Sequence, residues 1–233
     1  MKKIISILVL ILTFNSCNTS PKTDIVPTEK SNNNVDFTIA FGSCNNQVLA
    51  NNLWDDIESF DPNVWIWGGD VIYSDTEDMK FLEKNFNKQK NDSIYKSFIS
   101  KIETLGTWDD HDYGLNDGGF EYSKKDSAQQ LFLDFLDVPI NDARRKQQGL
   151  YHSKLYTTEE GSINVIVLDT RYFRSNLTPD TETRKRYKPN KLGEGTMLGK
   201  KQWLWLENEI KNSKANYTII ISSIQFLASE HGF

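Results

Sequence analysis

Apolar residues fall into short blocks that follow one of two periodicities. Nearly continuous apolar runs, typical of strands buried on both faces, occupy residues 37–41, 64–67, 163–168 and 217–224. Apolar residues at helical spacing occupy residues 49–60, 78–105, 127–136 and 198–210. The same spacing predicts that Trp203 and Trp205 face the core. This alternation of strands and helices predicts a layered domain of the α/β (α+β) class.

Length and charge narrow the class of protein. The chain has 233 residues, of which 38% are hydrophobic and 25% charged, which is enough to form one well-buried domain. The formal net charge is −5, so the chain offers no broad basic face. We therefore expect no nucleic-acid-binding surface.

The N-terminus has the pattern of an export signal. Lys2 and Lys3 precede an apolar run at residues 4–12, which is too short to span a bilayer as a helix. Ser16 then stands directly before Cys17, as in the bacterial lipoprotein signal, in which the cysteine is lipidated and becomes the new N-terminus. An ordinary secretory leader with an incidental cysteine is the alternative.

This pattern predicts three parts of the chain. Residues 1–16 are the signal peptide, residues 17–35 are a disordered polar tether, and residues 36–233 are the folded domain. The lipid on Cys17 would anchor the protein to a membrane in the cell envelope of a Gram-negative-type bacterium, in the periplasm or at the outer membrane. The sequence leaves the oligomeric state open.

The second cysteine, Cys44, has no partner for a disulfide if Cys17 is lipidated, because the chain has only two cysteines. A thiol of this kind in an oxidising compartment is either buried and inert or bound to a metal ion. Composition alone favours the inert reading.

Other polar residues that follow predicted strands favour the metal-bound state of Cys44. Cys44, Asp70 and the pair Asp109–Asp110 each follow a strand-like segment, as does Asp169. Ligands bind at the carboxyl edge of such sheets, and carboxylates gathered there repel one another unless cations lie between them. Taken singly, each aspartate is as well explained as a helix cap or turn residue.

Five motifs in a fixed order carry a resemblance to a known family: Gly42-Ser43-Cys44, Gly69-Asp70-Val71-Ile72-Tyr73, Trp108-Asp109-Asp110-His111-Asp112, Leu168-Asp169-Thr170-Arg171 and residues 198–206. This series resembles the PhoD-like alkaline phosphatases, which belong to the calcineurin-like and purple-acid-phosphatase-like metallophosphoesterases. The resemblance runs from about residue 37 to residue 233. It implies an αββα metallophosphoesterase-like sandwich that hydrolyses phosphate mono- or diesters.

The resemblance also implies a metal centre of Fe(III) with one or more Ca(II) ions. Cys44, Asp70 and Tyr73 would face the iron, and Asp70 would bridge to the second metal. Thiolate, phenolate and carboxylate are anionic donors that suit an ion of high charge. Asp110 is the candidate ligand of the second metal, with Asn116 as a weaker oxygen donor.

Four further residues are assigned by their place in the motifs. Asp109 is expected to be a ligand or to hydrogen-bond to one, and His111 to contact phosphate or protonate the leaving oxygen. Arg171 and Arg174 are expected to bind phosphate oxygens, unless they form salt bridges to nearby carboxylates.

The C-terminal residues depart from the family pattern. Metallophosphoesterases normally carry a further metal-binding segment, whereas this chain stops at Glu230-His231-Gly232-Phe233. We therefore expect the domain to be incomplete at its C-terminus and the 233-residue chain to be inactive if it is a fragment. An exposed sheet edge is expected where strands are missing.

Two other classes of function remain open. One is a non-catalytic surface lipoprotein, with a ligand-binding face formed by Trp54, Trp65, Trp67 and Trp108 and a structural metal site. The other is a domain that holds metal for stability without turnover. A serine hydrolase is disfavoured because the sequence lacks a Gly-x-Ser-x-Gly elbow.

Overall fold

The computed structural model describes residues 35–226. The predicted signal peptide, the lipidation site Cys17 and nearly all of the predicted tether lie outside the described residues, as does His231. Between residues 35 and 226, no helix has the length and apolar character that crossing a bilayer requires.

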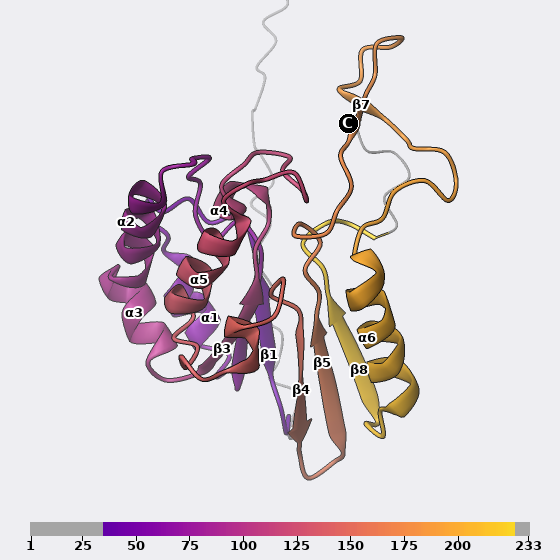
Figure 1. Cartoon of the computed structure of the whole chain (residues 1–233). Coiled ribbons are helices and arrows are strands. Elements are labelled where there is room, and N and C mark those ends of the chain that lie inside the picture. The colour runs from indigo at the N-terminus through magenta and orange to yellow at the C-terminus, as the bar shows by residue number, and fades with distance from the viewer. Residues whose placement is uncertain (1–34, 227–233) are drawn as a thin grey trace, which may run out of the picture. The chain divides into compact units, whose positions relative to one another are not determined.

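The first half of the described chain forms a parallel sheet with helices on one face (Figure 1). Its strands, in spatial order, are β1 (Ile39–Gly42), β2 (Val64–Gly68) and β3 (Glu103–Thr107). Its helices are α1 (Leu53–Glu58), α2 (Met79–Lys90), α3 (Ser93–Ile99), the short α4 (Asp110–Tyr113) and α5 (Lys125–Phe135). Since all three strands are parallel, their carboxyl ends meet at one edge.

The second half forms a mixed sheet covered by one long helix. After a 3-10 turn at Ala143–Arg145, its elements are β4 (His152–Thr157), β5 (Ser162–Val167), α6 (Gly199–Asn212) and β8 (Tyr217–Ile221). The order across the sheet is β4-β5-β8, with β4 antiparallel and β8 parallel to β5. A separate two-stranded hairpin consists of β6 (Thr178–Pro179) and β7 (Tyr187–Lys188).

Side chains that alternate along the central strands build the layers. Val64 and Ile66 of β2 pack with Val165 and Val167 of β5, so this cluster lies between the two sheets. Trp65 and Trp67 point the other way, into the core beneath the helices of the first half, where they meet Trp54, Tyr95 and Phe98. Ile166 and Leu168 pack with Leu206 of α6 on the outer face of the second sheet. The order helix, sheet, sheet, helix confirms the predicted αββα sandwich.

The helix predicted to extend through residue 105 is wrong at its end, because Glu103–Thr107 is strand β3. Its sequence, Glu-Thr-Leu-Gly-Thr, has few of the apolar residues that mark a strand. Gly106 lies against Trp67 so closely that a Cβ added there would be 2.7 Å from the Trp67 Cβ. The pairing of β3 with β2 therefore depends on a tertiary contact that periodicity does not encode.

The tryptophans correct two further expectations. Trp203 is not in the core, since it is 49% exposed, whereas Trp205 packs partly buried on the outer cluster. The four residues suggested as a ligand-binding face, Trp54, Trp65, Trp67 and Trp108, are all at most 3% exposed. They are core residues, so the aromatic face of the non-catalytic alternative does not exist.

Candidate metal centre

The loops that leave β1 and β2 continue the strand pairing past the sheet. The Cys44 amide donates to the Gly69 carbonyl at 3.3 Å, and the Asn45 amide donates to the Asp70 carbonyl at 2.8 Å. Cys44 and Asp70 both adopt left-handed backbone conformations, with φ of 59° and 52°. These turns hold the thiol and the carboxylate next to each other at the carboxyl edge of the sheet.

The loops after β2 and β3 are in close contact. Gly69 has a φ of 105°, and a Cβ there would come within 2.6 Å of the Asp109 Cβ, so the approach requires glycine. The fully buried carboxylate of Asp112 joins the same two loops. It accepts hydrogen bonds from the amides of Val71 at 2.9 Å and Asp109 at 2.7 Å. Asp112 therefore fixes the spacing between the two carboxylate-bearing loops.

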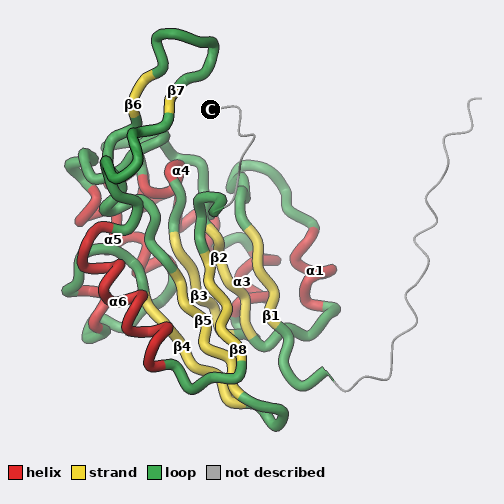
Figure 2. Tube along the Cα trace, turned by 90° about the vertical axis from the view of Figure 1, so that its right-hand side faces the viewer, coloured by secondary structure: helices red, strands yellow, loops and turns green. Residues whose placement is uncertain are grey.

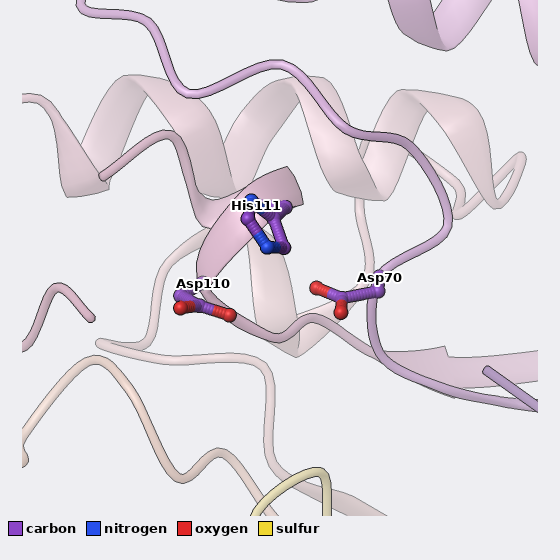
Figure 3. Close-up of side chains that lie close together, drawn as sticks. All are labelled: Asp70, Asp110 and His111. Carbon is purple, nitrogen blue, oxygen red and sulfur yellow. The ribbon is translucent and has the colours of Figure 1, made fainter. Parts of the chain in front are cut away.

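These loops bring together three groups that can bind a metal. Asp70, Asp110 and His111 each offer one ligand atom, and these atoms lie within 4.8 Å of one another. Figure 3 shows the three side chains converging, Asp70 from the loop after β2 and the other two from α4. Asp70 and Asp110 are buried, and His111 is partly exposed.

The two oxygens of Asp70 have different surroundings. Oδ2 faces the Cys44 thiol at 3.6 Å and the Tyr73 hydroxyl at 3.3 Å. Oδ1 is buried and has no partner in hydrogen-bond geometry among residues 35–226, although the nearby His111 backbone amide interacts with the carboxylate and lowers its pKa. Burial, together with the negative charges of Asp109 and Asp110, raises the pKa of Asp70 to about 6.

A metal ion fits this donor set. A buried carboxylate oxygen without a hydrogen-bond partner lowers the stability of the folded protein, and a bound cation would compensate for the missing partner. The thiol and the phenol that now face Oδ2 become anionic donors when a metal displaces their protons. The three residues assigned to the iron therefore lie together, in contact through Asp70.

Tyr73 is held in place by a reciprocal pair of hydrogen bonds. The Gln47 side chain donates to the Tyr73 carbonyl at 2.9 Å and accepts from the Tyr73 amide at 2.8 Å. The Tyr73 ring lies against the His111 ring, with centroids 4.3 Å apart. Burial and the nearby Asp70 charge raise the pKa of Tyr73, so without a metal the phenol keeps its proton.

His111 is oriented by Asp75. The imidazole Nδ1 lies 2.7 and 2.8 Å from the two carboxylate oxygens of Asp75, which leaves Nε2 for other contacts. Burial alone would lower the pKa of His111, but the hydrogen bond to Asp75 and the charge of Asp110 raise it. The geometry thus favours a protonated imidazole that faces the carboxylate group.

Arg171 compensates the charge of Asp109 and Asp110. Its guanidinium lies 2.6 Å from Asp109 Oδ1 and 3.5 Å from Asp110 Oδ1, and the residue is buried. Burial would raise the pKa of Asp110, but Arg171 and the Asp117 amide hold that pKa below its usual range. Asp110 is therefore ionised, as a metal ligand must be.

The structure leaves three sequence-predicted residues outside this group. The Arg174 guanidinium donates to the backbone oxygens of Ser175 and Asp117, and Asn116 is exposed. Asp169 is fully buried at the end of β5, where four protein donors bind it. Phosphate binding by Arg171 and Arg174 and metal binding by Asn116 stay predictions, while Asp169 has a structural role.

Sequence reasoning missed three aspartates that support the site. They are Asp75 on His111, Asp112 between the loops, and Asp117, whose amide donates to Asp110 Oδ2 at 2.8 Å. Asp112 belongs to the motif Trp108-Asp109-Asp110-His111-Asp112, and Asp75 lies only five residues after Asp70, so both could have been considered. Nothing in the sequence singles out Asp117. These residues act through their position in the folded chain.

Comparison with known proteins agrees with this architecture. The sequence pattern of the PhoD-like phosphatases matches residues 39–232. A solved structure described as "Structure of PhoD" is similar with a TM-score of 0.60 and 19% identity, which supports the fold. The similarity covers 79% of this chain and 41% of that one, so the chain spans about two fifths of that protein's length. No curated protein matches the sequence. Since the family match takes in most of its residues, the chain belongs to the PhoD-like phosphatase family.

Proposed function

We propose that this protein hydrolyses phosphoric esters, both mono- and diesters, at a metal centre built on Asp70. The observation that carries the proposal is the Asp70 carboxylate, with one buried oxygen free of partners in the described part of the chain and the other facing a thiol and a phenol. Membership of a phosphatase family gives this arrangement its chemistry.

Cys44, Asp70 and Tyr73 would hold Fe(III), and Asp70, Asp110 and Asp109 would hold Ca(II). When bound, such ions lower the pKa of water and neutralise phosphoryl oxygens. Sulfur and phenolate oxygen favour the more highly charged transition metal, whereas carboxylate oxygens suit calcium.

The protein's own residues would orient the ester and move a proton. His111, held through Nδ1 by Asp75, has Nε2 available to donate a proton to the leaving oxygen. Arg171 would hold Asp109 and Asp110 in place through its ion pairs, and it lowers the pKa of Asp110. We further propose that lipidated Cys17 anchors the enzyme to a cell-envelope membrane, where its substrates would be exported phosphate esters.

The test is hydrolysis by the protein expressed with its whole natural reading frame and purified without metal. Release of p-nitrophenol from p-nitrophenyl phosphate and from bis-p-nitrophenyl phosphate is followed after Fe(III) and Ca(II) are added. We expect turnover to depend on metal and to fall about a thousandfold in Asp70→Asn, a loss of about 4 kcal/mol in transition-state stabilisation.

The matched control is Asp61→Asn, an exposed aspartate that precedes β2, also with positive φ, which should keep full turnover. A folded, metal-loaded protein that cleaves neither ester would overturn the proposal. A folded protein that binds no metal and is inert would instead favour a non-catalytic surface lipoprotein.

A further inference from the structure

Asp117 lies in the turn after α4, seven residues beyond Asp110. It has a left-handed backbone, with a φ of 54°, a conformation that aspartate adopts more readily than most residues other than glycine. Its amide donates to Asp110 Oδ2 at 2.8 Å. The backbone of this one residue therefore sets the position of a candidate metal ligand.

Three residues from the second half of the chain contact Asp117, one at its carbonyl oxygen and two at its side chain. Buried Arg174 donates to its carbonyl oxygen, and Arg186 forms an ion pair with its Oδ2. The Tyr187 hydroxyl donates to the same Oδ2 at 3.1 Å. Arg186 and Tyr187 follow Asp117 by about 70 residues, so these are tertiary contacts.

Arg186 and Tyr187 lie on the β6–β7 hairpin, which projects from the same end of the domain as α4 in both views (Figures 1 and 2). Its strands of two residues each pair with one another and not with either large sheet. Most side chains from residue 180 to residue 195 are exposed. The base of the hairpin is anchored separately, because the Ser175 amide donates to the Thr196 carbonyl at 2.8 Å, and the hairpin reaches Asp117 through Arg186 and Tyr187.

We propose that Asp117 is a positioning residue for Asp110 and that the β6–β7 hairpin holds it in place through Arg186 and Tyr187. The inference rests on the proposed function, in which Asp110 binds calcium. Mutation of a group that hydrogen-bonds to a metal-ligating carboxylate typically lowers the affinity for the metal by about 10- to 100-fold. Loss of the contacts from the hairpin should therefore weaken calcium binding without unfolding the domain.

The experiment measures Ca(II) affinity by calorimetric titration of the full natural protein. Asp117→Gly removes the carboxylate but keeps the amide and suits the positive φ. Arg186→Gln removes the ion pair from the other side. The matched control is Asp61→Gly, because Asp61 is an exposed aspartate that also has a positive φ, of 47°. Thermal unfolding of each metal-free variant is recorded in parallel.

We expect the Kd for Ca(II) to rise about tenfold in Asp117→Gly and in Arg186→Gln, with unfolding temperatures that match the wild type. The control should bind Ca(II) as the wild type does. Wild-type affinity in both variants, or an equal loss in Asp61→Gly, would overturn the inference while ester hydrolysis stands. If the wild type neither binds Ca(II) nor hydrolyses esters, the proposed function and this inference fall together.

Discussion

The ends of β2 and β5 carry aspartates that look alike in sequence and differ in their surroundings. Asp169 is fully buried, and both of its oxygens accept hydrogen bonds, from the Trp108 indole and from the amides of Leu150, Arg171 and Tyr172. Asp70 is nearly as buried, yet its Oδ1 has no partner within the described residues, and Oδ2 faces a weakly donating thiol and a phenol.

The comparison separates a structural carboxylate from a candidate ligand. Most buried polar groups have a hydrogen-bond partner, and both oxygens of Asp169 have theirs within the protein. Asp70 lacks one at Oδ1 within the described residues, whereas burial raises the pKa of both carboxyl groups. The number of donors, and not the place at a strand end, is what distinguishes the two sites.

The largest expected effect on folding comes from Asp169→Asn. The amide NH2 would face at least one of the backbone or indole donors, and leave that donor unpaired in the core. We expect the free energy of unfolding to fall by about 3 kcal/mol. Urea denaturation followed by tryptophan fluorescence measures it.

Urea denaturation of metal-free Asp70→Asn sharpens the contrast between Asp70 and Asp169. Asparagine tolerates a positive φ, and the change removes a repelled carboxylate, so stability should stay within about 0.5 kcal/mol of the wild type or rise. Equal destabilisation by the two substitutions would show that both aspartates are structural.

A smaller effect on stability should appear at low pH and should come from His152. His152 donates from Nδ1 to the Leu150 carbonyl, and its buried Nε2 has no partner among the residues described. Burial and the charge of Arg144 lower its pKa to about 4, from 6.5. Because the folded pKa lies below the unfolded one, stability is full above pH 6.5 and declines as the pH falls toward 4.

At pH 5 the lowered pKa of His152 reduces the free energy of unfolding of the wild type by about 2 kcal/mol. His152→Phe should remove that part of the acid sensitivity, which is measured as the difference in unfolding free energy between pH 7.5 and pH 5 for both proteins. An identical pH dependence in the variant would show that folding does not lower the pKa of His152.

The smallest effect concerns the orientation of His111. Asp75→Asn weakens the hydrogen bond to Nδ1, and we expect kcat/KM for p-nitrophenyl phosphate to fall about tenfold in the full natural protein. Glu77→Gln, an exposed change two residues away, is the control. A tenfold loss in both variants would assign the effect to local charge instead of to the histidine.

The sequence predicted the layers because strands buried on both faces have a distinctive apolar pattern. Residues 64–67 and 163–168 became the central strands β2 and β5. It missed β4, whose residues His152–Thr157 are mostly polar and lie at the edge of a sheet. The prediction that the helix extends through residue 105 is wrong because strand β3 depends on the packing of Gly106 under Trp67, which is a tertiary feature.

Within the site, the family resemblance implied that Asp70, Asp110 and His111 serve one centre, and their ligand atoms do lie within 4.8 Å of one another. Motifs did not distinguish Asp169 from Asp70, since a count of hydrogen-bond donors requires the fold. They also could not reveal Asp117, whose contacts come from residues about 70 positions later.

Each sheet is built from one continuous stretch of chain, the first from residues 39–107 and the second from 152–221. During synthesis Asp70, Asp109 and Asp110 therefore leave the ribosome well before Arg171, which compensates them. We expect the first half to carry a self-repelling cluster until the second half docks. Because Arg171 comes from the second half, we expect metal affinity to report whether the two halves have joined correctly.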